Sequence, residues 1–243
     1  MIDDQILENL VIISKKAAAR AYVVAGEGNI SARSSSGGEF WIKRSGCPLA
    51  ETEPKDFIKL DIKSAVKDLK KAQEAVVYRK NVTYRASIEA AMHALIYASQ
   101  ESAYYVVHSH PPSALAGCCI DNMEGFFRPQ FPDSIVYLGI PERNWIFLEY
   151  ASPGTGISKL LRYALKNFDG ELRVVILANH GTITIGQSAT EAITRTEVLE
   201  KASSIKLLSM IAGKPTHLNM DDIKYLENME SERYRQRIMR EKI

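Results

Sequence analysis

The chain has 243 residues, of which 46% are hydrophobic and 25% charged, a composition that excludes an intrinsically disordered or collagen-like protein. Its 31 basic and 29 acidic side chains leave a formal charge of only +2, too small for the general attraction that dominates binding to nucleic acid. The longest apolar stretches, such as 17–25 and 174–178, are far shorter than the roughly 20 residues of a membrane-spanning helix, so we expect no membrane partner.

The start of the chain and its cysteines indicate a cytoplasmic protein. The N-terminus, Met1-Ile2-Asp3-Asp4, begins acidic and lacks the basic and then apolar order of a secretory signal. Cys47, Cys118 and Cys119 are odd in number and form neither a disulfide framework nor a Cys-x-x-Cys metal pair. Because no linker divides the sequence, we expect a single domain over residues 1–243, with a charged tail from about residue 214.

Hydrophobic periodicity predicts an α/β protein that opens with a helix. Apolar residues recur at steps of three and four over residues 3–24, the spacing of an amphipathic helix. Short alternating runs at 29–33 and 39–43 flank a Ser/Gly turn and predict a β-hairpin. The same reasoning predicts, in chain order, a strand near 57–60, a charged helix near 62–73, a helix at 87–99 and a strand at 104–109 that ends before two prolines.

The second half of the sequence continues the alternation of strands and helices. It predicts, in order, a strand at 135–138, a helix from about 156 to 167, strands at 173–178 and 182–185, and a long helix at 188–212. The charged residues from 227 to 242 predict a helix that is solvated or contacts another subunit. Because strands that alternate with helices usually form parallel sheets, the pattern by itself indicates a parallel sheet.

Histidines follow two of the predicted strands. His108 and His110 end the strand at 104–109, and because strand side chains alternate between faces, the two imidazoles point the same way, as in a chelate. His180 stands in a tight turn after a second apolar strand, where a third imidazole would complete a His₃ site with one open position. Ordinary strand-end hydrogen bonding would explain the same residues, so the histidines alone leave both interpretations open.

The carboxylate of Glu89 lies on the predicted helix just before the strand that ends in His108 and His110. Glu89 and His93 are four residues apart on the predicted helix and therefore share a helix face. Glu89 could serve as a base or as a fourth metal ligand. Alternatively, the pair is a plain helix-surface contact, with His93 packed among its apolar neighbours.

Two glycine-containing turns carry hydroxyl, amide and cationic donors. The first is Gly26-x-Gly28-Asn29 with Ser31, and the second is Lys43-Arg44-Ser45-Gly46. Backbone N–H groups in such turns, together with these side chains, can hold a phosphate. Glycine turns with neighbouring serines are also common without any ligand, so each turn alone is weak evidence.

Taken in order, these motifs resemble the class II aldolase/adducin family. The resemblance runs from about residue 5 to 212. It rests on Gly28-Asn29-Ile30-Ser31-Ala32-Arg33, Ser45-Gly46, Ser87-x-Glu89-x3-His93, Val107-His108-x-His110-Pro111 and Asn179-His180-Gly181, followed by a helix with Glu191-Ala192 and Glu197-x2-Glu200. The phrases around Ser87 and Lys43 are most similar to the rhamnulose-phosphate-aldolase-like branch.

This resemblance implies a fold, a site and an assembly. The implied fold is a three-layer α/β/α sandwich around a mostly antiparallel sheet, in place of a parallel one. The implied assembly is a homotetramer with active sites at its interfaces. By the same resemblance, zinc or another divalent ion is held by His108, His110 and His180, the catalytic acid/base is Glu89, and the substrate phosphate is held by Asn29, Ser45, Gly46 and Ser87.

The chain departs from the family pattern beside the glutamate. Where fuculose-phosphate aldolases have two adjacent serines, this chain has Ser87-Ile88 and so loses one hydroxyl donor. Lys43 or Arg44 could supply a compensating charge to the phosphate. The family's catalytic tyrosine comes from a neighbouring subunit, and Tyr137 is a candidate for it.

Retro-aldol chemistry accounts for this set of residues. Breaking a carbon–carbon bond next to a carbonyl forms an enediolate, which a divalent ion stabilises as a Lewis acid while a carboxylate moves the proton. We therefore expect a zinc-dependent aldolase that cleaves a ketose 1-phosphate, a small sugar phosphate, to dihydroxyacetone phosphate and an aldehyde. The alternatives are a pentulose-phosphate 4-epimerase, whose branch usually carries aspartate in place of Glu89, a methylthioribulose-phosphate dehydratase, and a non-catalytic adducin-like scaffold lacking the metal residues.

Overall fold

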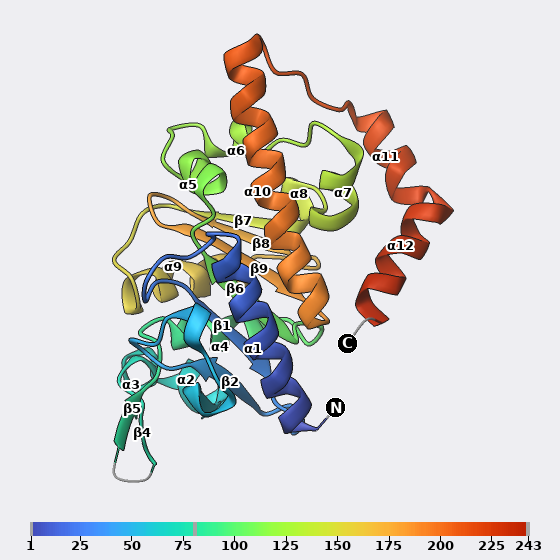
Figure 1. Cartoon of the computed structure of the whole chain (residues 1–243). Helices are drawn as coiled ribbons and strands as arrows, with labels where there is room; N and C mark the ends of the chain where they lie inside the picture. Colours follow the sequence, from blue (N-terminus) through green and yellow to red (C-terminus); the bar gives the residue numbers. More distant parts are fainter. Residues whose placement is uncertain (1, 80–81, 242–243) are drawn as a thin grey trace.

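A seven-stranded sheet forms the centre of the protein, whose computed structural model describes residues 2–79 and 82–241 (Figure 1). The strands lie in the order β3-β2-β1-β6-β9-β8-β7. Their bounds are β1 Asn29–Arg33, β2 Glu39–Lys43, β3 Phe57–Asp61, β6 Tyr105–Ser109, β7 Trp145–Leu148, β8 Val174–Leu177 and β9 Gly181–Gly186. A separate hairpin of β4 (Val76–Arg79) and β5 (Val82–Arg85) projects from the body.

The sheet is mostly antiparallel. Among the described strands of this sheet, β7 and β8 form the one parallel pair. The expected hairpin of β1 and β2 is present, and short turns join β1 to β2 and β8 to β9. Because parallel strands need a crossover connection of a dozen or more residues, turns this short require antiparallel pairing. The parallel sheet indicated by the strand–helix alternation is therefore wrong, and the mostly antiparallel sheet is confirmed.

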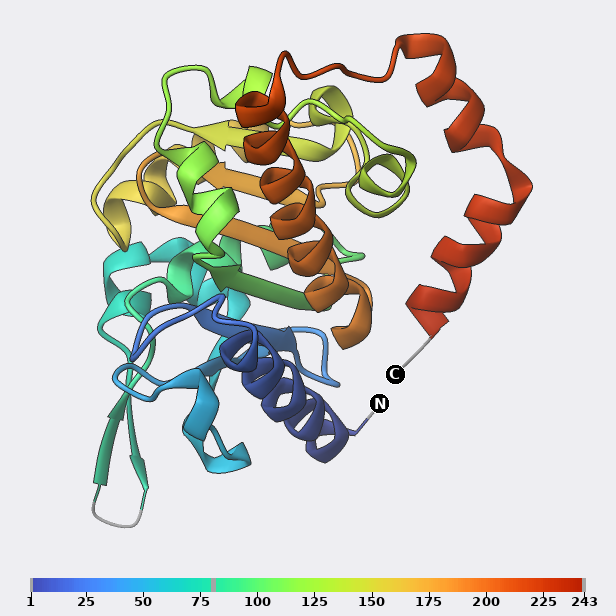
Figure 2. The same ribbon diagram turned by 45° about the horizontal axis from the view of Figure 1, so that its top comes forward.

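Helices cover both faces of the sheet and complete a three-layer α/β/α sandwich (Figures 1 and 2). On one face, α2 (Ile62–Lys67), α3 (Leu69–Gln73), α4 (Ala90–Ser99) and α9 (Thr155–Lys166) enclose a core that includes Phe40 and Ile183. On the other, α1 (Asp3–Ala19), α5 (Pro112–Cys118) and α10 (Ala189–Ala212) pack around residues such as Ile30 and Leu199. Within the described ranges, no helix is both long and apolar enough to cross a bilayer.

One predicted strand is a helix. Residues 135–138 lie in α7, Pro132–Leu138, although their sequence is rich in residues that favour strands. Pro132 occupies the first turn, where its fixed φ suits a helix and its missing N–H is not needed. Ile135 and Leu138, three residues apart, are both buried. Packing of α7 against α10 thus overrides the local strand preference.

Several predicted helices differ from the observed ones in their ends. The predicted helix at 62–73 is divided at Asp68, whose side chain caps α3 by accepting a hydrogen bond from the backbone N–H of Lys71 (2.9 Å). The opening helix ends at Ala19, before the predicted end at residue 24, and Ala21 adopts a left-handed φ of 55°. The pattern did not predict β7, the β4–β5 hairpin, α5 or two single-turn helices, α6 (Met123–Phe126) and α8 (Pro141–Asn144).

The charged tail forms two helices that fold back on the chain. α11 (Met220–Asn228) packs on α7, and α12 (Glu230–Glu241) contacts α7 and α10. Figure 2 shows the two red helices turning back alongside the body of the protein. Arg240 donates to Glu191 (3.2 Å), close to the start of α10 and therefore near the end of β9. Residue 242, the last of the predicted tail helix, lies outside the described residues.

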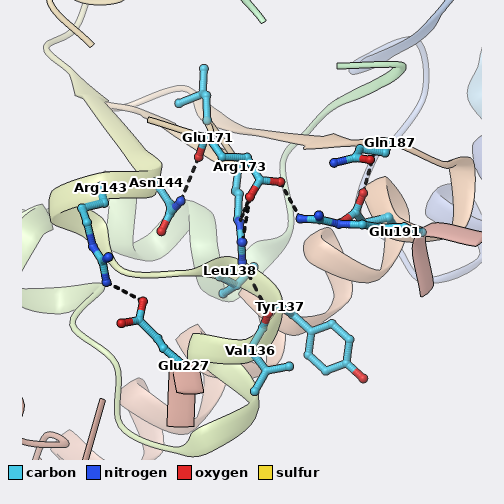
Figure 3. Close-up of polar contacts among 12 residues, drawn as sticks. Val136, Tyr137, Leu138, Arg143, Asn144, Glu171, Arg173, Gln187, Glu191 and Glu227 are labelled. Carbon is cyan, nitrogen blue, oxygen red and sulfur yellow. Dashed lines mark hydrogen bonds and ion pairs between the residues drawn. The ribbon is translucent and has the colours of Figure 1, made fainter. Parts of the chain in front are cut away.

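A cluster of charged side chains that includes Glu171, Arg173 and Glu191 lies beside the start of β8 (Figure 3). Arg240 of α12 joins the tail to it by donating to Glu171 (2.7 Å). Arg195 of α10 is buried and donates to Glu191 (2.7 Å), to the Tyr137 carbonyl (3.0 Å) and to the Ile185 carbonyl. Burial lowers the pKa of Arg195 to about 10, so the side chain stays charged at neutral pH. Glu171 accepts a hydrogen bond from Arg173 (2.8 Å) at the same end of the sheet, just before β8 begins.

Replacing Arg195 with methionine should lower the free energy of unfolding by about 3–5 kcal/mol, because it leaves the buried Glu191 carboxylate without its closest cation. Arg143→Met is the matched control, since its exposed guanidinium pairs with Glu227 and should contribute at most about 1 kcal/mol. Urea denaturation at neutral pH measures both values. Equal losses for the two variants would contradict this prediction.

Candidate metal and active site

Three imidazoles meet at one end of the sheet. β6 and β9 are antiparallel, with His108 opposite Ile183 and Ser109 opposite Thr182. The end of β6, which carries His108 and leads to His110, therefore lies beside the turn that precedes β9 and carries His180. One ring nitrogen from each histidine lies within 4.8 Å of the others. The structure thus brings together the three histidines that the sequence singled out.

The spacing of these nitrogens suits a divalent ion. His108 Nε2 and His110 Nε2 are 3.3 Å apart, and two nitrogens bound tetrahedrally at zinc distances of about 2.0–2.1 Å are separated by about 3.3–3.4 Å. His108 Nδ1 donates to the Thr182 carbonyl (3.0 Å), which leaves Nε2 as the nitrogen with a free lone pair. The three-imidazole donor set and the spacing of this pair fit a zinc-like ion.

The turn that carries His180 has a special backbone. Asn179 has a left-handed φ of 53°, a conformation that asparagine tolerates better than most residues. At Gly181, an added Cβ would lie 2.5 Å from His110 Cδ2 and 2.8 Å from the Ser109 carbonyl oxygen. Glycine is therefore required for this turn to approach the end of β6 and bring His180 to the other two imidazoles.

Glu89 completes the group from the helix side. It is the residue before α4, and its carboxylate oxygens lie 3.2 Å from His108 Nε2 and 3.3 Å from His180 Nε2. Asn29 at the start of β1 donates its side-chain amide to Glu89 (2.7 Å). These contacts place the carboxylate at the nitrogens that face the centre of the histidine group.

The charges at this site depend on burial and on close neighbours. Burial raises the pKa of Glu89, but His108, His180 and the Asn29 amide lower it more, so the carboxylate has a pKa well below its usual value. Burial lowers the pKa of His180 to about 4 and also lowers that of His110. For His108, burial acts in the same direction, but the Glu89 carboxylate outweighs it and raises the pKa.

His93 lies behind this site and not in it. It is fully buried, and its Nδ1 lies 2.6 Å from the Ser31 hydroxyl, which also contacts the Tyr97 hydroxyl at 2.7 Å. The alternating residues 29, 31 and 33 of β1 thus bond to α4 and its flanks, since Arg33 donates to the Tyr97 carbonyl (2.7 Å). The packed role considered for His93 agrees with this position.

Two of the four candidate phosphate residues, Asn29 and Ser87, contact Glu89 directly. Ser87 is buried, and its hydroxyl oxygen accepts from the Glu89 backbone N–H (3.3 Å). The Ser45 backbone N–H donates to the Arg85 carbonyl (2.8 Å), so the exposed Ser45-Gly46 turn lies beside the segment that leads to Ser87. Gly46 has a φ of 74°. Asn29 and Ser87 thus lie at Glu89, and the Ser45-Gly46 turn is joined through Arg85 to the segment that precedes Ser87.

The two cations considered for the phosphate have other partners. Lys43 is buried, and its ammonium donates to the carbonyls of Gly26 (3.1 Å) and Cys47 (2.8 Å), which ties the two glycine turns together. Burial lowers its pKa to about 8. Arg44 forms an ion pair with Asp56 (2.7 Å). Ile88, the departure from the family pattern, is 46% exposed.

Tyr137, the candidate for the family's catalytic tyrosine, lies on α7, where Arg235 of the tail donates to its hydroxyl (3.1 Å).

Glu27 lies beside the histidine group, although it was not among the predicted site residues. Its Oε2 is 3.1 Å from His110 Nδ1. The sequence feature that could have indicated Glu27 is its place between two glycines in the first glycine-containing turn, where it is the one charged side chain.

Fold and site together define an α/β protein with a three-histidine centre able to hold a divalent metal ion. A model of the class II aldolase and adducin N-terminal domain matches residues 8–207. The chain therefore belongs to the class II aldolase and adducin family, as its motifs predicted.

Relatives of this chain include named sugar-phosphate aldolases. An L-fuculose phosphate aldolase from Methanocaldococcus jannaschii is 22% identical over 207 residues, which are 85% of this chain and 98% of that one. A 5-deoxy-D-ribulose 1-phosphate aldolase from Bacillus thuringiensis is 27% identical over 221 residues, or 90% and 92% of the two chains. YgbL from Klebsiella pneumoniae has a similar fold, with a TM-score of 0.74 and 21% identity over 93% of this chain and 99% of that one.

Proposed function

We propose that this protein is a zinc-dependent aldolase that cleaves a ketose 1-phosphate to dihydroxyacetone phosphate and an aldehyde. The observation that carries the proposal is the position of the Glu89 carboxylate, 3.2 and 3.3 Å from two imidazoles of the three-histidine group. A buried base beside a metal centre is the arrangement that retro-aldol cleavage needs. The name of the Bacillus thuringiensis relative also supports a sugar 1-phosphate as substrate.

His108, His110 and His180 would hold the ion, which as a Lewis acid would stabilise negative charge on the substrate oxygens beside the broken bond. In the cleavage step, a carbon–carbon bond breaks and its electron pair stays with the half that becomes dihydroxyacetone phosphate. The hydroxyl of the other half loses its proton and becomes the aldehyde. Glu89, whose carboxylate lies beside His108 and His180, can take a proton and return one to the carbon that keeps the electron pair.

The phosphate would lie over the Ser45-Gly46 turn, next to Ser87 and Asn29. The turn is exposed, and Gly46 has a left-handed φ of 74°, a conformation that occurs in anion-binding turns. Lys43 would contribute by joining the two turns and by its positive charge, since its ammonium already contacts both of them.

Replacing Ser45 with alanine should raise KM for the phosphorylated substrate about tenfold or more, with a smaller change in kcat. The reason is that a hydrogen bond to a charged group contributes about 1.5–3 kcal/mol. Inhibition by inorganic phosphate should weaken in parallel. Ser36→Ala, in the turn between β1 and β2, is the control and should leave both constants unchanged. A preference of the wild type for unphosphorylated sugars would overturn the phosphate assignment.

We also propose that the protein acts in the cytoplasm as a homotetramer with active sites at subunit interfaces. The three free cysteines, of which Cys119 is exposed, suit a reducing compartment. Closed cyclic symmetry is the usual solution for head-to-tail contacts between identical subunits. The tail packs on its own chain through α7 and α10, so the residues that reach a neighbour would come from other parts of the surface or from the outer face of the tail.

A screen of ketose 1-phosphates for release of triose phosphate tests the proposed activity. Cleavage that stops on treatment with a chelator and returns with zinc would support it. Product analysis also separates the alternatives, because an epimerase returns an isomer of the same mass, a dehydratase releases water and a decarboxylase releases carbon dioxide. If the metal-loaded protein releases no triose phosphate and yields only an isomer, a dehydrated product or carbon dioxide, the aldolase assignment is wrong and the corresponding activity takes its place.

A further inference from the structure

One of the three imidazoles has a charged partner on its outer side. Glu27 lies in the loop between α1 and β1, and its Oε2 is 3.1 Å from His110 Nδ1. The opposite ring nitrogen, His110 Nε2, faces His108 Nε2 at 3.3 Å. The carboxylate therefore contacts His110 from behind and accepts a hydrogen bond from Nδ1–H, so that the Nε2 lone pair points into the histidine group.

The other two imidazoles lack such a partner. His108 Nδ1 donates to a neutral backbone carbonyl, that of Thr182 (3.0 Å). His180 Nδ1 is buried and has no hydrogen-bond partner within the described part of the chain. A carboxylate raises the basicity of an imidazole more than a neutral carbonyl does. His110 is thus the ligand whose donor strength the surrounding residues can increase most.

Both oxygens of Glu27 are engaged, and this fixes its position. Its Oε1 accepts from the Val24 backbone N–H (2.5 Å) within the same loop, while the His110 backbone N–H donates to the Tyr22 carbonyl (2.8 Å). At Gly28, which has a φ of 66°, an added Cβ would lie 2.5 Å from a Val23 side-chain carbon and 3.0 Å from the His108 carbonyl oxygen. The loop therefore lies close against the end of β6 and holds Glu27 at His110.

We propose that Glu27 is a positioning residue for the metal centre: it sets the orientation and the tautomer of the His110 ring and so strengthens the binding of a divalent ion. This inference rests on the proposed metal site and adds a residue to it, because Glu27 lies just outside the Gly28–Arg33 motif that carries the family resemblance. Loss of such an outer partner typically weakens metal binding 10–100-fold.

Zinc titration of the full-length protein against a chromophoric chelator tests the proposal. Glu27→Gln keeps the size of the side chain and one acceptor oxygen but removes the charge, and Glu27→Ala removes both contacts. We expect the zinc Kd to rise 10–100-fold in both variants, with the alanine variant weaker. The visible spectrum of bound cobalt should also change, since it reports the geometry of the ligands.

Glu53→Gln is the matched control, because this exposed glutamate pairs with Lys55 on the surface and should leave the zinc Kd unchanged. Wild-type zinc affinity in both Glu27 variants would overturn the positioning role while leaving the metal site intact. Failure of the wild type to bind zinc would instead overturn the metal site and this inference together. If Glu27→Ala does not fold, the glutamine variant and its cobalt spectrum decide the question.

Discussion

Replacing Glu89 with glutamine is expected to lower turnover by about 10²–10⁴-fold, the usual range for loss of a general acid/base, while the protein keeps its metal. The amide occupies the same space but cannot take up a proton. It can still face His108 and accept a hydrogen bond from Asn29, which now contacts the carboxylate at 2.7 Å. Steady-state kinetics on the substrate found by the product screen, together with elemental analysis, measure both outcomes.

Glu74→Gln is the control for this variant, because Glu74 is exposed, pairs with Lys70 and should leave turnover unchanged. Near-normal turnover after Glu89→Gln would remove the proposed proton-transfer role. Loss of metal together with activity would show that the carboxylate holds the ion, which is the other role its distance from His108 and His180 permits.

Replacing His110 with alanine should empty the metal site. Two imidazoles remain, and a site with two of three protein ligands no longer binds a zinc-like ion tightly. We expect about one metal ion per chain in the wild type and close to none in the variant by elemental analysis. Because a ligand that binds only the folded state stabilises it, zinc should raise the Tm of metal-free wild type but not that of the variant.

His217→Ala is the matched control for the metal measurement. His217 lies far along the chain, beside Lys206 (3.2 Å), and its loss should leave metal content unchanged. Wild-type metal content in His110→Ala would contradict the three-histidine assignment, whichever reaction the protein catalyses.

The sequence by itself determined much of this protein. The hairpin of β1 and β2, the strand β6 that leads into the His-x-His motif and the long helix α10 follow from local hydrophobic periodicity and turn residues, which act over a few neighbouring positions. The motifs from Gly28 to Gly181 also predicted the family. Ser188 was expected to begin the long helix, and it caps α10 by accepting from the Glu191 backbone N–H (3.0 Å).

Only the tertiary structure decided the rest, because it depends on contacts between residues distant in sequence. Residues 135–138 are helical because α7 packs on α10, although their composition favours a strand. The sheet is antiparallel because of which strands pair across it, and strand–helix alternation does not specify the pairing. In the same way, Glu27 meets His110 across 83 residues of sequence, and its place between two glycines does not identify a partner that it reaches only when β1 and β6 become neighbours.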